Sequence, residues 1–218
     1  MLSHLDFIIF SDRCEVLEII PSQRYFYPIY KNASSSINEE AKKNKWRVYL
    51  NEQIKRLPGV DVIIRDPEER FVSGVSSFVT QILKENPTLD KNTVLWFVKN
   101  YLHLNRHYCM QFSWLLNLAR YLHPDVKINL LGMDAVKQIT ILESNPWGVK
   151  DKVELKLENL PSQEMYQRID QVLFNTIGQS LTFAEILQLI KDQDADAYKQ
   201  VIQRSQSILN PTYVVPKT

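Results

Sequence analysis

Two segments of the chain share one order of elements: a short apolar strand, a small polar loop and a stretch of helix-forming residues. We expect the first unit over 25–45, with its loop at 32–36, and the second over 60–83, with its break at 65–67. In open parallel sheets, ligands lie beyond the carboxyl ends of the strands. The two loops are therefore expected to meet at one ligand.

The rest of the chain extends this pattern into an α/β fold. The strands that we expect span 15–20, 25–30, 60–64 and 126–131. The helices that we expect span 37–45, 68–83, 91–103, 108–122, 163–177, 183–190 and 195–208. Strands joined through helices predict a central parallel sheet flanked by helices, here with a mostly helical C-terminal part. A length of 218 residues favours a single domain over 1–218.

Composition narrows the choice of partners. The formal net charge is +1, so no global field draws the chain to nucleic acid or to an anionic membrane, and a local site must hold any bound anion. Two cysteines, Cys14 and Cys109, match neither a disulfide framework nor a metal pattern and indicate a reducing compartment. The apolar run at 5–10 is interrupted by Asp6 and follows no basic region, so neither a signal peptide nor a membrane anchor is expected. We expect a cytoplasmic protein.

The first loop has the residues of an anion site. Backbone amides at a helix start, the helix dipole and serine hydroxyls together suit a phosphate, and a lysine beside them can neutralise a leaving oxygen. The loop consists of Lys31, Asn32, Ala33, Ser34, Ser35 and Ser36. An ordinary helix start is the alternative interpretation, because Ser36 and Glu39 have the spacing of a capping box.

The second loop supplies an arginine. Arg65 follows the strand directly, and Ser73 lies further along the expected helix. The planar fork of an arginine makes two charge-assisted bonds to a phosphate, which suits a terminal phosphate group. For Arg70 and Asp66 we favour structural roles, Arg70 in an ion pair with an acid of the helix and Asp66 as the helix cap.

Together these motifs resemble the PAPS-dependent sulfotransferases over roughly residues 24–80. In that family the lysine and hydroxyl residues of the first loop bind the 5'-phosphosulfate of 3'-phosphoadenosine-5'-phosphosulfate (PAPS), and the arginine and serine hold its 3'-phosphate. Lys31, Ser34, Ser35, Ser36, Arg65 and Ser73 occupy these positions, with Ala33 in place of the usual glycine. The resemblance implies a P-loop-like three-layer fold, PAPS as donor and its desulfated form, PAP, as product. The triphosphate-binding pattern G-x-x-x-x-G-K-[ST] is absent from the sequence, which argues against a kinase and a required metal.

Sulfuryl transfer requires a general base, which deprotonates the acceptor group that attacks sulfur. His107 and Gln111 resemble the His-x-x-x-Gln element of the carbohydrate-type branch, and an imidazole titrates near neutrality. His107 is the first candidate, and Glu40 with its neighbour Glu39 is the alternative. Structural roles also stay open. His107 could be a histidine with its hydrogen bonds satisfied at a helix start, and Glu39 and Glu40 could be solvated charges that the helix dipole favours.

The resemblance thus implies transfer of a sulfuryl group from PAPS to a hydroxyl or amine of a small-molecule or glycan acceptor. No metal, nucleic-acid or membrane partner is expected. Two alternatives remain: a non-catalytic nucleotide-binding protein of the same fold, and a divergent small-molecule kinase. The loops expected to shape an acceptor pocket, 85–91 and 145–151, carry no diagnostic chemistry.

Overall fold

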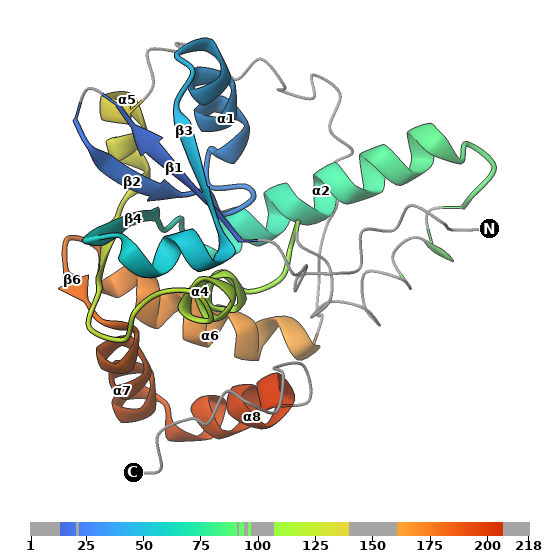
Figure 1. The fold of residues 1–218 in the computed structure, drawn as a ribbon. Helices are drawn as coiled ribbons and strands as arrows, with labels where there is room; N and C mark the ends of the chain where they lie inside the picture. The colour runs from blue at the N-terminus through green and yellow to red at the C-terminus, as the bar shows by residue number, and fades with distance from the viewer. Residues whose placement is uncertain are drawn as a thin grey trace.

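A computed structural model describes residues 14–20, 22–90, 92–93, 96, 107–139 and 161–206 of the chain (Figure 1). The strands are β1 (Glu15–Ile19), β2 (Arg24–Tyr27), β3 (Arg47–Leu50), β4 (Gly59–Ile63), β5 (Lys127–Leu131) and β6 (Ser180–Leu181). The α-helices are α1 (Ser34–Lys43), α2 (Pro67–Glu85), α4 (Gln111–Ala119), α5 (Val136–Ile139), α6 (Pro161–Asn175), α7 (Phe183–Gln193) and α8 (Ala195–Gln206). Short 3-10 helices are η1 (Asn51–Arg56) and η2 (Met133–Ala135).

The described strands form a six-stranded mixed sheet in the order β3-β1-β2-β4-β5-β6. Strands β2, β4 and β5 are parallel neighbours, whereas β1, β3 and β6 join antiparallel. The expected parallel sheet is therefore limited to its three central strands. The cause lies in the connections: a tight turn, with Ser22 N donating to Ile19 O at 3.1 Å, leaves no room for a crossover between β1 and β2.

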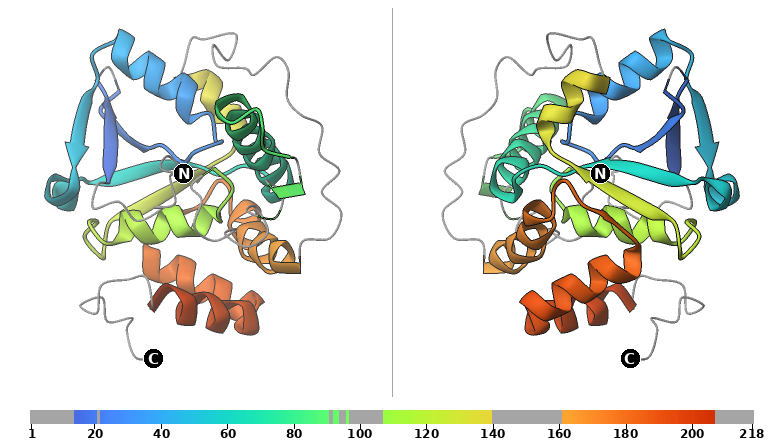
Figure 2. Two further views of the ribbon diagram at one scale, coloured as in Figure 1. Left: turned by 90° about the vertical axis from the view of Figure 1, so that its right-hand side faces the viewer. Right: turned by 90° about the vertical axis from the view of Figure 1, so that its left-hand side faces the viewer.

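Helices cover both faces of this sheet, with α1 and α5 on one side and α4, α6 and α7 on the other (Figure 2). Alternate strand residues face the two layers, as the pleat of a strand requires. The α1 side buries Leu17, Ile19, Phe26 and Ile63 with Ile37, Ala41 and Ile139. The other side buries Val16, Val62, Ile128 and Leu130 with apolar residues of α2, α4, α6 and α7. Cys14 and Cys109 are free cysteines, and both are buried in the core.

The sequence located most of the described elements, with shifted ends. Helix α1 begins at Ser34 rather than near 37, and α4 begins at Gln111 rather than near 108. Strands β3 and β6 were not predicted, because β3 is largely exposed and β6 has two residues. Most of the helix expected over 91–103, and the loop expected at 145–151, lie outside the described residues.

Candidate functional site

The two sequence-predicted loops lie side by side at the carboxyl ends of β2 and β4. These strands are parallel neighbours, paired through Phe26 with Asp61 and through Tyr27 with Val62. Arg65 Nη1 donates to the carbonyl oxygen of Lys31 at 3.3 Å. The structure therefore brings the lysine of the first loop and the arginine of the second into direct contact.

The first loop turns into α1 through an unusual backbone. Lys31 has a φ of 70° and Ala33 a φ of 60°, so both adopt the left-handed conformation that favours glycine. Ala33 is the N-cap of α1, and it makes no side-chain capping hydrogen bond. Ser36 lies inside the helix and is not its N-cap, so the alternative interpretation of Ser36 and Glu39 as a capping box is wrong. An alanine N-cap offers no side-chain acceptor to the amides of the first turn, which suits an anion-binding helix start.

The three serines differ in exposure. Ser34 is buried, Ser35 is exposed and Ser36 is half-buried. Asn32, by contrast, is fully buried, and its Nδ2 donates to the carbonyl oxygen of Ile63 at 2.7 Å. Ser35 and Ser36 can therefore present hydroxyls to a ligand, whereas Asn32 fixes the loop to the end of β4.

Arg65 reaches from the second loop to the first, and 25% of its side chain is exposed. Its Nε and Nη2 each lie 3.4 Å from Oε2 of Glu69, one turn along α2. The Glu69 side chain is 67% exposed, so solvent screens this pair and the pair is weak. An incoming phosphate would compete with Glu69 for the same guanidinium.

Ser73 lies two turns into α2 and is half-buried. The rise from Pro67, where the helix begins, to Ser73 is about 9 Å along the helix axis. A group that contacts both Arg65 and Ser73 must therefore lie along the first turns of α2.

Asp66 and Arg70 are structural residues, as predicted, although Arg70 has different partners. Asp66 caps α2 by accepting from the amide of Glu69 at 2.9 Å. Arg70 is only 2% exposed and does not pair with an acid of its helix. Its Nε donates to Tyr30 O at 3.2 Å and its Nη1 donates to Cys109 O. It therefore supports the first loop from inside the protein.

Gln111 and Asp170 are two residues of this region that the sequence did not single out as functional. Oε1 of Gln111 accepts from Asn32 Nδ2 at 2.6 Å and from the amide of Arg65 at 2.9 Å. Both carboxylate oxygens of Asp170 accept amides of α4, from Gln111 at 2.7 Å and from Phe112 at 3.1 Å. Burial raises the pKa of Asp170 to about 6, although nearby Arg70 acts to lower it. The His-x-x-x-Gln spacing could have pointed to Gln111 from the sequence. Asp170 belongs to no such motif and lies on α6, far along the chain.

His107 lies close to the first loop. Its ring meets Tyr30, the residue before Lys31, edge to face with centroids 5.6 Å apart. A Cβ placed on Gly74 would collide with the carbonyl group of His107, so the chain at 107 lies directly on α2 at Gly74, the residue after Ser73 in the sequence. The structure thus brings His107 near residues of both predicted binding segments.

Glu40 has a different setting. It is 3% exposed, and its Oε1 accepts from Asn44 Nδ2 at 2.6 Å. Asn44 ends α1, so this contact holds the carboxylate toward the end of the helix that is opposite Lys31. Glu39 is engaged with Lys42 at 3.0 Å on the surface. Of the candidate bases, His107 has the position nearer the loops.

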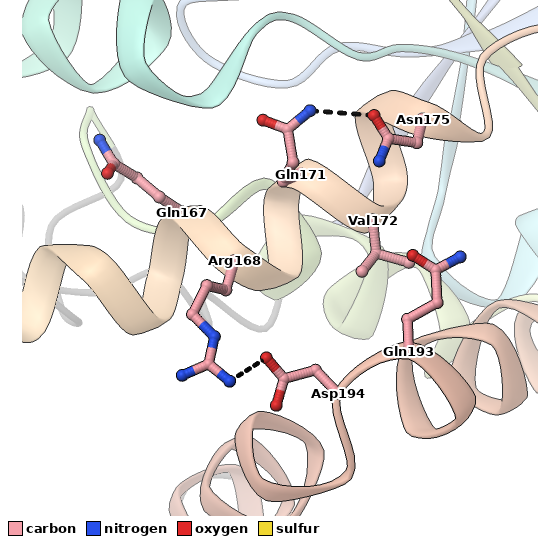
Figure 3. A pocket seen from close by; sticks show the side chains of 7 residues that line it. All are labelled: Gln167, Arg168, Gln171, Val172, Asn175, Gln193 and Asp194. Carbon is pink, nitrogen blue, oxygen red and sulfur yellow. Dashed lines mark hydrogen bonds and ion pairs between the residues drawn. The ribbon is translucent and has the colours of Figure 1, made fainter.

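A separate polar hollow of about 390 Å³ lies between α6 and the α7–α8 junction (Figure 3). Its lining residues are Gln167, Arg168, Gln171, Val172, Asn175, Gln193 and Asp194. Arg168 pairs with Asp194, and Gln171 donates to Asn175 at 2.9 Å, as the dashed lines in Figure 3 indicate. None of the residues predicted from the sequence lines this hollow, and four of its lining residues are engaged with one another in these two pairs.

Within the described parts of the chain, no group of three or more histidine, cysteine, aspartate or glutamate residues is arranged to hold a metal ion. In the same residues, no helix combines the length and apolar character needed to cross a membrane. No protein-family model, no curated protein and no solved structure matches the chain.

Proposed function

We propose that the chain is a PAPS-dependent sulfotransferase whose acceptor is a hydroxyl or amine of a carbohydrate or other small molecule. The observation that carries this proposal is the meeting of the Lys31 and Arg65 loops at the ends of two parallel strands. The order of the motifs along the chain supports it. In this proposal β2, β4 and β5 form the core of a P-loop-like fold.

Each loop would bind one end of the donor. The amides at the start of α1, that of Ser34 included, take the 5'-phosphosulfate together with the hydroxyls of Ser35 and Ser36. Arg65 takes the 3'-phosphate and Ser73 adds a neutral donor. The doubly phosphorylated adenosine would then lie along the first turns of α2, with its phosphosulfate directed toward Lys31.

The reaction is an in-line displacement at sulfur. The acceptor oxygen or nitrogen forms a bond to sulfur, and the bond from sulfur to the bridging phosphate oxygen breaks, which releases PAP. Lys31 stabilises the negative charge that develops on the departing oxygen. His107 takes the proton of the acceptor, and Glu40 is the less favoured base because its carboxylate is bound to Asn44. Positioning and electrostatics supply the catalysis, by analogy with phosphoryl transfer.

Labelled PAPS offered with a panel of sugar, peptide and phenol acceptors tests the activity. Wild type should transfer the label, and Lys31→Ala should lower kcat about 100-fold or more while changing PAP affinity only a few-fold. Lys55→Ala, on the exposed surface of η1, is the matched control and should retain full activity. Normal turnover in Lys31→Ala would remove the lysine from the mechanism, and PAP binding without transfer to any acceptor would favour a non-catalytic nucleotide-binding protein.

A further inference from the structure

The buried carboxamide of Gln111 joins the two loops. It is 0% exposed and contributes three hydrogen bonds across the site. Oε1 accepts from Asn32 Nδ2 in the first loop and from the amide of Arg65 in the second, at 2.6 Å and 2.9 Å. Nε2 donates to the carbonyl oxygen of Arg65 at 2.9 Å. The Gln111 side chain therefore bonds both the amide and the carbonyl group of Arg65. It also bonds the buried Asn32, which lies between Lys31 and Ala33.

Chemistry favours a carboxamide at this position. The two lone pairs of Oε1 are both used, and the adjacent amide nitrogen supplies a donor at a fixed separation. A carboxylate cannot donate to Arg65 O, and an apolar side chain leaves the polar groups of both loops without this partner. Buried polar groups that lose a partner cost free energy, so the loops would have to move to recover one.

Asp170 fixes Gln111 in turn. The carboxylate belongs to α6, and its two oxygens accept the amides of Gln111 and Phe112 at the start of α4. Asp170 is 4% exposed, and the positive end of the α4 dipole stabilises the negative charge of its carboxylate. The position of α4, and with it of the Gln111 side chain, is therefore tied to α6.

From these contacts we propose that Gln111 is a positioning residue that sets the separation and orientation of the Lys31 and Arg65 loops, with Asp170 holding it in place. This inference rests on the proposed function for its ligand, a nucleotide with phosphates at both the 5' and 3' positions. The loops must hold both phosphates at once, so a change in their relative position weakens binding without removing any group that touches the ligand.

The test compares Gln111→Met, which is close to isosteric, with Asn117→Leu on the same helix. Asn117 is also buried, at 3% exposed, but its Nδ2 donates to the hydroxyl of Tyr27 at 3.3 Å. Calorimetry should find PAP affinity lowered about 10-fold or more by Gln111→Met and little changed by Asn117→Leu. Because both variants lose a buried hydrogen bond, a general loss of stability would weaken binding in both alike.

Hydrogen exchange in the absence of nucleotide gives a readout that does not depend on the proposed function. The amide of Arg65 should lose protection in Gln111→Met and keep it in Asn117→Leu, because its acceptor is Gln111. Unchanged protection of this amide in Gln111→Met would overturn the inference, as would unchanged PAP affinity in a protein that binds PAP. Lost protection in a protein that does not bind PAP at all would refute the function and leave the positioning role in place.

Discussion

At the scale of single residues, the charge on Arg65 is shared before any ligand arrives. Glu69 lies 3.4 Å from its guanidinium and neutralises part of it, while Lys31 contributes only a backbone carbonyl to the contact. A recognition arginine that already has a partner must exchange it for the ligand. The free energy of the Arg65–Glu69 ion pair is therefore lost when the ligand binds, and the affinity for the ligand is lower by that amount.

Replacing Glu69 with glutamine should therefore strengthen PAP binding. An exposed pair of this kind contributes about 0.5 kcal/mol, so the expected gain is about 2- to 3-fold in affinity. Glu68→Gln is the matched control, because Glu68 is exposed, adjacent and carries the same charge. Calorimetric titration with PAP measures both variants, and equal gains in the two would point to a general effect of net charge and away from competition at Arg65.

At the scale of elements, the start of α1 shows a local conflict between residue type and backbone. Ala33 has a φ of 60°, a conformation that costs a residue with a Cβ about 1–2 kcal/mol. A glycine has no such cost, although it loses more conformational freedom on folding. The loop thus keeps the geometry of a glycine turn with an alanine in it.

Ala33→Gly should stabilise the protein by about 0.5–1 kcal/mol. The control is Ala41→Gly, inside the right-handed part of the same helix, which should destabilise by about 1 kcal/mol or more. Urea unfolding measures both. If Ala33→Gly destabilises the protein as Ala41→Gly does, the left-handed conformation at Ala33 is wrong.

The same elements show what a sequence can reveal. The runs at 15–20 and 60–64 predicted strands because β-branched residues at buried positions leave a local pattern. The edge strand β3 has no buried face, so its sequence shows no such pattern. The two loops were predictable because each follows its strand directly, whereas Asp170 reaches the site only through the packing of α6 on α4. The antiparallel pairing of β6 with β5 also depends on such long-range contacts, whereas the tight turn between β1 and β2 is local.

At the scale of the whole molecule, a buried carboxylate links stability to pH. The pKa of Asp170 is raised to about 6 by burial, above the value of about 3.9 in an unfolded chain. The folded state therefore binds more protons in this range. The contribution of Asp170 to stability is full below about pH 4 and is lost as pH rises through 6.

This sign predicts how wild type compares with Asp170→Asn. The difference between their free energies of unfolding, wild type minus variant, should fall by about 2 kcal/mol between pH 4 and pH 7. Urea unfolding at a series of pH values measures it, and the other titrating groups cancel in the difference. A difference that stays constant with pH would show that the Asp170 pKa is not raised in the folded protein.

The central claim is that the Lys31 and Arg65 loops bind the two ends of one doubly phosphorylated adenosine. The most direct test is the affinity for PAP relative to adenosine 5'-monophosphate, which lacks the 3'-phosphate, in wild type and in Arg65→Ala. Charge-assisted hydrogen bonds contribute about 1.5–3 kcal/mol, so wild type should prefer PAP by about 10- to 100-fold. Arg56→Ala, an exposed arginine of η1, should keep that preference. The account predicts that Arg65→Ala loses the preference while its affinity for the monophosphate is unchanged; a wild type without preference, or a preference that survives in Arg65→Ala, would contradict it.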